Sequence, residues 1–174
     1  MDEEILKQHI RDIPDFPKPG VVFKDITPLL SHSVAFRAVV LQMADAYADA
    51  GITKVAGIEA RGFIFAAPIA FVLGAGFVPI RKEGKLPHDV EGEDYELEYG
   101  TDLLEVHRDA VAAGDRVLIV DDVLATGGTA AAAVRLMMKL EAEVAGLAVV
   151  VELDFLGGRS KLADDLRLLT LIHY

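Results

Sequence analysis

Apolar runs separated by polar turns divide this sequence into alternating strands and helices. Residues 117–120, 144–151 and 166–173 are largely apolar, which is typical of strands that a parallel sheet buries on both faces. Apolar side chains also recur at helical spacing from Phe36 to Tyr47, and the alanine-rich residues 130–140 predict a further helix. This alternation predicts an α/β fold with a mostly parallel central sheet and helices on both faces.

Residues 62–80 carry no charged side chain and are about as long as a membrane-spanning helix. Pro68 and the sequence Gly74-Ala75-Gly76 interrupt this stretch, and both are unfavourable within one long helix. We therefore expect a helix and a short strand that the sheet buries, and no membrane association. The same glycines lack the third glycine of a dinucleotide-binding fingerprint, so we assign them no nucleotide role.

One stretch, Val117–Thr129, passes from an apolar strand through two acids into a glycine loop and reads VLIVDDVLATGGT. In open α/β sheets, ligands bind just outside the carboxyl ends of the strands, where we expect the two acids. Glycines can take positive φ and leave successive N–H groups free to converge on one anion, which the N-terminus of the next helix would also face. The predicted phosphate-binding residues are Ala125, Thr126, Gly127, Gly128 and Thr129.

The two acids indicate which phosphate compound binds. A vicinal diol presents two hydroxyl donors and ionised carboxylates only accept hydrogen bonds, so Asp121 and Asp122 suit the 2- and 3-hydroxyls of a ribose. A ribose phosphate or mononucleotide would satisfy the acids and the loop together, with Mg²⁺ balancing part of the added negative charge. The alternative is that the aspartates cap a helix and the glycines only turn the chain. The order of strand, acid pair and glycine loop favours the binding site.

Length, charge and cysteine content narrow the classes of function. At 174 residues the chain fits a single domain, residues 1–174. Its formal net charge of −11 disfavours nucleic acid as a partner, because binding to a phosphate backbone relies on clustered Lys and Arg. The absence of cysteine excludes disulfides, thiol nucleophiles and zinc–thiolate sites. No charged and apolar leader opens the chain, so we expect a cytoplasmic protein.

An acidic chain that binds a polyphosphate must concentrate positive charge locally. Arg81, Lys82 and Lys85 follow one apolar run closely, and Arg61 follows another. Guanidinium and ammonium groups near strand ends suit the oxygens of a pyrophosphate. A solvated basic turn is the simpler alternative, but the position of this cluster near the predicted strand ends favours anion binding.

The motif VLIVDDVLATGGT resembles the phosphoribosyl pyrophosphate signature of the type I phosphoribosyltransferases. Further segments narrow the resemblance to the adenine phosphoribosyltransferases, namely FPKPGVVFKDITPLL (residues 16–30), IEARGF (58–63), IRKEGKLP (80–87) and YELEYG (95–100). The resemblance implies the type I phosphoribosyltransferase fold, with a small N-terminal hood (residues 1–30) and a flexible, loop-like lid (86–102). It also implies transfer of the phosphoribosyl group of phosphoribosyl pyrophosphate to adenine, which gives AMP and pyrophosphate in purine salvage.

The same resemblance implies roles for the basic residues. It assigns Arg61, Arg81, Lys82 and Lys85 to pyrophosphate, with Arg61 also catalytic, and it often supplies the Arg81 equivalent from a partner subunit. A homodimer would then be part of the active site. We expect Mg²⁺ as a cofactor that substrate and water hold in the main, with no direct protein ligand.

The base pocket follows from the resemblance as well. Phe23 would stack on adenine, the main chain at Val22 and Lys24 would read its polar edge, and Val123 would add to the pocket. From the residues alone, a packed edge strand is the simpler interpretation of residues 21–23. Lys24 stands where we expect an arginine, which matters little if only main-chain atoms contact the base.

The lid carries the remaining candidates. The resemblance matches Glu98 and Tyr99 to lid residues that close over the substrates, because a ribosyl cation equivalent must be shielded from water. Glu98 is the candidate general acid/base at the purine nitrogens. From the residues alone, an acidic segment of this kind is simply solvated.

Two other functions compete with this interpretation. A related enzyme would use xanthine, hypoxanthine or orotate, and a 6-oxo base would need a donor where adenine presents an amino group. Alternatively, a regulator would keep the phosphoribosyl site as a sensor without catalysis. The sequence shows no DNA-binding element or basic tail, and the retained lid and basic turn favour chemistry.

Overall fold

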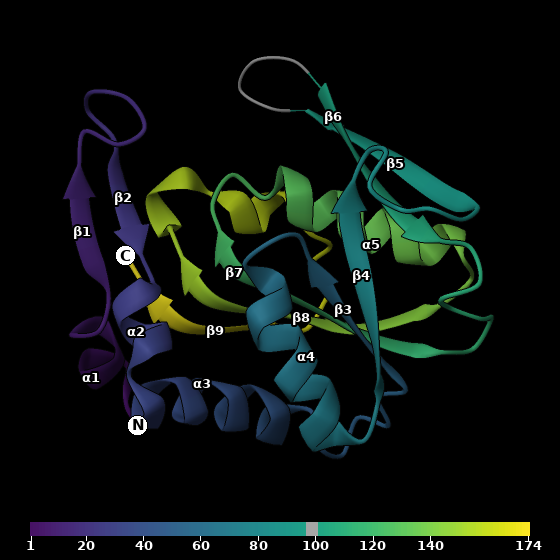
Figure 1. Cartoon of the computed structure of the whole chain (residues 1–174), viewed down its shortest axis with the longest axis horizontal. Coiled ribbons are helices and arrows are strands. Elements are labelled where there is room, and N and C mark those ends of the chain that lie inside the picture. The colour runs from purple at the N-terminus through teal and green to yellow at the C-terminus, as the bar shows by residue number, and fades with distance from the viewer. Residues whose placement is uncertain (97–100) are drawn as a thin grey trace.

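A central sheet of seven strands runs through the described part of the chain, residues 1–96 and 101–174, in our computed structural model (Figure 1). Its strand order is β5-β6-β4-β3-β7-β8-β9. The parallel part contains β3 (Lys54–Ile58), β4 (Gly76–Lys82), β7 (Arg116–Leu124), β8 (Glu143–Glu152) and β9 (Leu168–His173). An antiparallel pair, β5 (Val90–Glu96) and β6 (Thr101–His107), extends the sheet beyond β4. The predicted α/β fold with a mostly parallel sheet is confirmed.

Helices cover both faces of this sheet, because successive side chains of a strand point to opposite sides. On one face, α3 (Ser33–Ala46) and α4 (Gly62–Leu73) share a buried core with Leu118 and Val120 of β7. On the other face, α5 (Gly128–Lys139) shares a core with Val117 and Ile119. Both sides of β7 are therefore apolar, which explains why its sequence does not alternate.

The N-terminal residues lie beside the C-terminal edge of the sheet (Figure 1). They form α1 (Glu3–Lys7), β1 (Arg11–Pro14), β2 (Val22–Asp25) and α2 (Thr27–Ser31). β1 and β2 pair antiparallel in a small sheet of their own. α1 contacts β9, and Glu3 Oε1 accepts a hydrogen bond from the His173 N–H at 2.8 Å. Two short 3-10 helices, η1 (Asp154–Leu156) and η2 (Gly158–Lys161), connect β8 to β9.

The expectation of a loop over residues 86–102 is wrong for much of that segment. Residues 90–96 and 101–107 pair as the hairpin β5–β6. Tyr95 of β5 and Leu104 and Val106 of β6 are buried, although acidic residues surround Tyr95 in the sequence. The strands form because pairing and one apolar face compensate for an acidic composition that disfavours strands.

Two element boundaries also differ from expectation. Asp121 and Asp122 lie within β7, which continues to Leu124, and not after its end. Pro68 lies inside α4, and the helix ends at Gly74, whose φ of 66° is left-handed. Residues 62–80 thus form a helix and a strand as predicted, and the glycines provide the break. Among the described residues, no helix is long and apolar enough to cross a membrane.

Candidate active site

A pocket of about 510 Å³ opens at the carboxyl ends of β3 and β7. β2 closes it on one side and the residues after β8 close it on another. Because parallel strands bring their carboxyl ends to one edge of the sheet, segments far apart in sequence meet here. The predicted site residues that line this pocket are Val22, Phe23, Lys24, Arg61, Lys82, Asp121, Asp122, Val123, Ala125 and Thr129.

The glycine loop forms a smaller hollow of about 80 Å³ next to this pocket, lined by residues including Thr126 and Gly127. Gly127 has a φ of 80° and is the N-cap of α5, and no side chain in the described residues caps this helix. The first N–H groups of α5 are therefore available to an anion. Gly128 faces a different hollow, of about 570 Å³, between the β5–β6 hairpin and α5. The structure thus places the predicted phosphate loop at a helix N-terminus.

The two acids lie side by side in the lining of the pocket, Asp122 buried and Asp121 partly buried. The Asp122 N–H donates to Asp121 Oδ1 at 2.8 Å, and Arg61 Nε lies 2.9 Å from Asp122 Oδ2. Burial raises the pKa of Asp121 well above its usual value, and the neighbouring charge of Asp122 raises it further. Burial also raises the pKa of Asp122, although the Arg61 guanidinium opposes this shift. The pocket therefore holds two carboxyl groups whose charged forms need hydroxyl donors or a cation.

These oxygens also fit the expected cofactor. Carboxylate and hydroxyl oxygens are the donors that Mg²⁺ prefers, usually together with water and substrate phosphate. Asp122 Oδ2 is buried and accepts no hydrogen bond from the described residues, since Arg61 approaches it as an ion pair only. The donor set is therefore compatible with Mg²⁺ bound next to a phosphorylated ligand.

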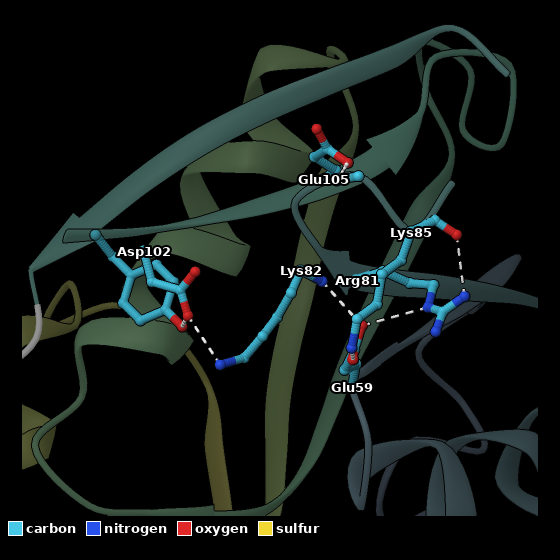
Figure 2. Close-up of polar contacts among 8 residues, drawn as sticks. Glu59, Arg81, Lys82, Lys85, Asp102 and Glu105 are labelled. Carbon is cyan, nitrogen blue, oxygen red and sulfur yellow. Dashed lines mark hydrogen bonds and ion pairs between the residues drawn. The ribbon is translucent and has the colours of Figure 1, made fainter. Parts of the chain in front are cut away.

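The basic residues separate into two groups (Figure 2). Lys82 turns toward the pocket and pairs with Asp102 Oδ2 at 2.9 Å. Arg81 points the other way, and its Nε lies 3.3 Å from Glu59 Oε2. Lys85 Nζ pairs with the second oxygen of Glu59. Because adjacent residues of a strand point to opposite sides, Lys82 lines the pocket whereas Arg81 does not. Arg61, which precedes α4, also lines the pocket, and Lys85, in the turn after β4, does not.

Glu59 also fixes the main chain of the basic turn. Its Oε2 accepts a hydrogen bond from the Lys82 N–H at 2.9 Å. On the other side of the turn, Glu105 Oε2 accepts one from the Gly84 N–H at 2.9 Å (Figure 2). Burial alone would raise the pKa of Glu59, but the hydrogen bonds from Lys85 and Lys82 outweigh it, so the pKa is lowered. An ionised carboxylate therefore anchors the turn to the end of β3.

The apolar end of the pocket is built around Phe23. The Arg61 guanidinium carbon lies 5.2 Å from the centre of the Phe23 ring, within the range of a cation–π contact. The Lys24 side chain turns away, since its Nζ lies 2.7 Å from Asp12 Oδ1 and 3.7 Å from the centre of the Tyr174 ring. The Lys24 main chain is therefore what faces the pocket, because its ammonium group contacts Asp12 and Tyr174.

Sequence reasoning missed several residues of this pocket. Leu153 and Leu156 line the apolar end, and Tyr95 and Glu59 line the polar end. Leu153 directly follows the carboxyl end of β8, so the rule that located the acids would also have found it. No local pattern marks Tyr95, because its place depends on the hairpin. The predicted lid residues Glu98 and Tyr99 lie outside the described residues.

Comparison with known proteins assigns the chain to a family. A model of the phosphoribosyl transferase domain matches residues 32–170. The adenine phosphoribosyltransferase of Thermobifida fusca is 59% identical over 169 residues, which cover 97% of this chain and 96% of the relative. The crystal structure of the Rhodothermus marinus adenine phosphoribosyltransferase superposes with a TM-score of 0.94 at 50% identity, covering 98% of this chain and 97% of that one. The Saccharomyces cerevisiae enzyme, complexed with an imino-altritol bisphosphate and adenine, gives a TM-score of 0.91 at 42% identity over 97% of each chain. The chain therefore belongs to the adenine phosphoribosyltransferases, within the phosphoribosyl transferase family.

Proposed function

We propose that this chain transfers the phosphoribosyl group of phosphoribosyl pyrophosphate to adenine, forming AMP and pyrophosphate, in the pocket at the ends of β3 and β7. One juxtaposition carries the proposal. The acid pair, part of the glycine loop and the apolar surface around Phe23 line one continuous pocket. A ribose phosphate and a flat base need these three surfaces together, and about 510 Å³ is within the usual range for small-ligand sites.

The acids and the loop would hold the ribose phosphate. Asp121 and Asp122 accept hydrogen bonds from the two ribose hydroxyls, and the N–H groups at the start of α5 bind the 5-phosphate, with Thr126 and Thr129 adding hydroxyl donors. Burial supports this role, because it raises the pKa of both acids and a diol would favour their charged forms. Charge neutralisation of the leaving pyrophosphate is the chemistry that Mg²⁺ supplies when bound with the substrate.

During the transfer, the bond from C1 to pyrophosphate breaks and its electron pair leaves with pyrophosphate. Adenine N9 forms the new bond to C1, and the base gives up its ring proton to a general base as the bond forms. The ribose is most positive between these events, and the nearby carboxylates of Asp121 and Asp122 would stabilise that charge. We assign Glu98 as the general acid/base at the purine nitrogens and Tyr99 as its neighbour in a lid over residues 86–102.

The base would stack on Phe23, between the N-terminal hood (residues 1–30) and Val123. The main chain at Val22 and Lys24 would read its polar edge. The engagement of the Lys24 ammonium by Asp12 and Tyr174 supports a main-chain role. The departure from arginine at this position is then of little consequence for the base.

The pyrophosphate would meet cations from two subunits. Arg61 and Lys82 line the pocket of their own chain. Arg81 and Lys85 pair with Glu59 and do not themselves line this pocket, so we propose that a homodimer brings the partner subunit's Arg81 to the pyrophosphate.

An exposed apolar surface on α4 supports this dimer. The uncharged sequence of α4 leaves Ile64 and Val72 partly exposed and Phe71 87% exposed. Phe77 of β4, the strand that carries Arg81, is also exposed. A helix that is apolar on all sides is normally buried, and a second copy of this chain would cover it.

The test is pyrophosphate release from phosphoribosyl pyrophosphate and Mg²⁺ with adenine, hypoxanthine, xanthine, guanine or orotate in separate reactions. We expect release with adenine alone. Release with another base would keep the phosphate site and overturn the assignment of the pocket around Phe23. Tight binding of phosphoribosyl pyrophosphate without release from any base would indicate a sensor.

A further inference from the structure

The segment that follows β8, residues 153–161, touches both halves of the pocket. Leu153 and Leu156 line its apolar end. Gly158 is buried against the glycine loop, and a Cβ at this position would lie 2.2 Å from the Ala125 carbonyl oxygen. A Cβ at Gly127 would likewise lie 2.2 Å from the Gly158 carbonyl oxygen. Main chain therefore packs directly on main chain here, and the position of Gly158 determines where the glycine loop lies.

One ion pair, between the half-exposed side chain of Arg159 and the buried carboxylate of Glu152, fixes this segment. Arg159, the residue after Gly158, places its Nε 3.0 Å from Glu152 Oε1 and its second terminal nitrogen 2.6 Å from Glu152 Oε2. Glu152 is only 4% exposed, and Thr170 Oγ1 of β9 donates to its Oε2 at 2.7 Å. A guanidinium that binds both oxygens of a carboxylate is held in one orientation, which a single charge contact does not achieve.

Neither member of this pair lines the pocket of about 510 Å³. Burial alone would raise the pKa of Glu152, but the hydrogen bonds from Arg159 and Thr170 outweigh it, so the carboxyl stays ionised at neutral pH. His173 and Asp154 lie close enough for the three groups to resemble a metal site. Because Arg159 and Thr170 already occupy both oxygens of Glu152, we assign no metal to this cluster.

We infer that Glu152 and Arg159 are positioning residues for the phosphoribosyl site. Their ion pair holds residues 153–161 so that Gly158 supports the glycine loop and the two leucines close the apolar end. The inference rests on the proposed function, because it assumes that the loop binds the 5-phosphate. Loosening the pair moves the loop and weakens the binding of any 5-phosphorylated ribose, while the reacting groups stay in place.

The test compares Glu152→Gln and Arg159→Lys with the wild type. The first removes the charge, and the second keeps the charge but cannot contact both oxygens. We expect each to raise the KM for phosphoribosyl pyrophosphate by about tenfold and to leave kcat within about twofold. Glu143→Gln is the matched control, because Glu143 pairs with Arg116 at the opposite end of the same strand. This control should leave both constants unchanged.

A binding measurement separates this inference from the proposed function. Thermal shift by ribose 5-phosphate and AMP reports on the loop whether or not the chain releases pyrophosphate. We expect a smaller shift for Glu152→Gln and Arg159→Lys than for the control, and almost none for Gly158→Ala, whose Cβ would displace the loop. If the two pair variants melt earlier but keep the wild-type KM and ligand shifts, the pair is only structural and the inference fails.

Discussion

Asp121 is a carboxyl group at a position where the fold disfavours the charged form. Burial and the Asp122 charge raise its pKa well above the unfolded value, so the folded state binds more protons and loses stability as pH rises between the two pKa values. Asp121→Asn removes this titration and still accepts the hydrogen bond from the Asp122 N–H. We expect its Tm to exceed that of the wild type at pH 7 by about 2–4 °C for each kcal/mol gained, and turnover to collapse. Melting curves from pH 4 to 8 measure the gain, which should shrink as pH falls.

Asp115 provides the matched control with the opposite sign. The Ala112 N–H and the Thr53 hydroxyl donate to its carboxylate and lower its pKa. Its stabilisation is present above the unfolded pKa and is lost as pH falls through the folded pKa. Asp115→Asn should therefore melt earlier than the wild type at pH 7 with turnover unchanged. An Asp121→Asn variant that also melts earlier, or that keeps its turnover, would contradict the assignment of Asp121.

Whether the sequence could predict a site residue depends on how far along the chain its neighbours in the site lie. Asp121, Asp122 and the glycine loop are adjacent in the chain, so one sequence motif predicts their shared binding role. The opposite directions of Arg81 and Lys82 follow from strand pleating, which becomes certain only once β4 has its bounds. Leu153 and Glu59 each directly follow the carboxyl end of a strand, so the strand-end rule could have found them. Tyr95 reaches the pocket only through the β5–β6 hairpin, which no local pattern encodes. Predictability therefore falls as a residue depends more on distant pairing.

Tyr47, the residue that follows α3, joins that helix to β8 and to the start of β9. Its fully buried hydroxyl donates to the Leu147 carbonyl of β8 at 3.1 Å and lies 3.2 Å from the Arg167 carbonyl oxygen, just before β9. Tyr47→Phe leaves these carbonyls without that donor and should lower the free energy of unfolding by ~1–2 kcal/mol. Urea unfolding measures the loss. The KM values should stay unchanged, because Tyr47 does not line the pocket.

Gly146 tests the same contact from the other side. A Cβ at this position would lie 2.6 Å from the Tyr47 hydroxyl oxygen and 2.9 Å from the Arg167 carbonyl oxygen. Gly146→Ala should therefore cost more than Tyr47→Phe, about 2–3 kcal/mol, because two packed elements must separate. Equal urea midpoints for the wild type and both variants would show that α3 is not anchored here.

The elements themselves were predictable to different degrees for a physical reason. The apolar patterns of β7, β8 and α5 can each be recognised from the residues of that element alone, so these elements were predictable. The hairpin β5–β6 has an acidic strand that the pattern does not reveal. Glu93 of this strand pairs with Arg135 and Lys139 of α5. The sequence alone suggests that this acid is solvated, but its ion pairs connect β5 to α5. A charged strand of this kind is stabilised by the elements that it contacts, so its own sequence does not predict it.

At the scale of the whole molecule, the exposed side chains of α4 and the direction of Arg81 point to the same conclusion. A single chain leaves Phe71 87% exposed and pairs Arg81 with Glu59, so that Arg81 itself does not line its own pocket. Both features are explained if two copies pack through α4 and each copy places its Arg81 in the pocket of the other. Dimer formation and activity should then fail together when Phe71→Glu places a charge in the apolar surface, as light scattering and pyrophosphate release would show.

Mixing two inactive variants distinguishes exchange of Arg81 from simple dimerisation. In a mixed dimer of Arg81→Ala and Asp121→Asn chains, one pocket keeps Asp121 and receives an intact Arg81 from the partner subunit, while the other pocket lacks both groups. Random pairing of equal amounts should therefore restore about a quarter of wild-type activity from two inactive parents. If Arg81 acted on its own pocket, every pocket in the mixture would lack one group and no activity would return. A different affinity tag on each variant would allow the mixed dimers to be purified. If these mixed dimers released no pyrophosphate, Arg81 would not act in the pocket of the partner subunit.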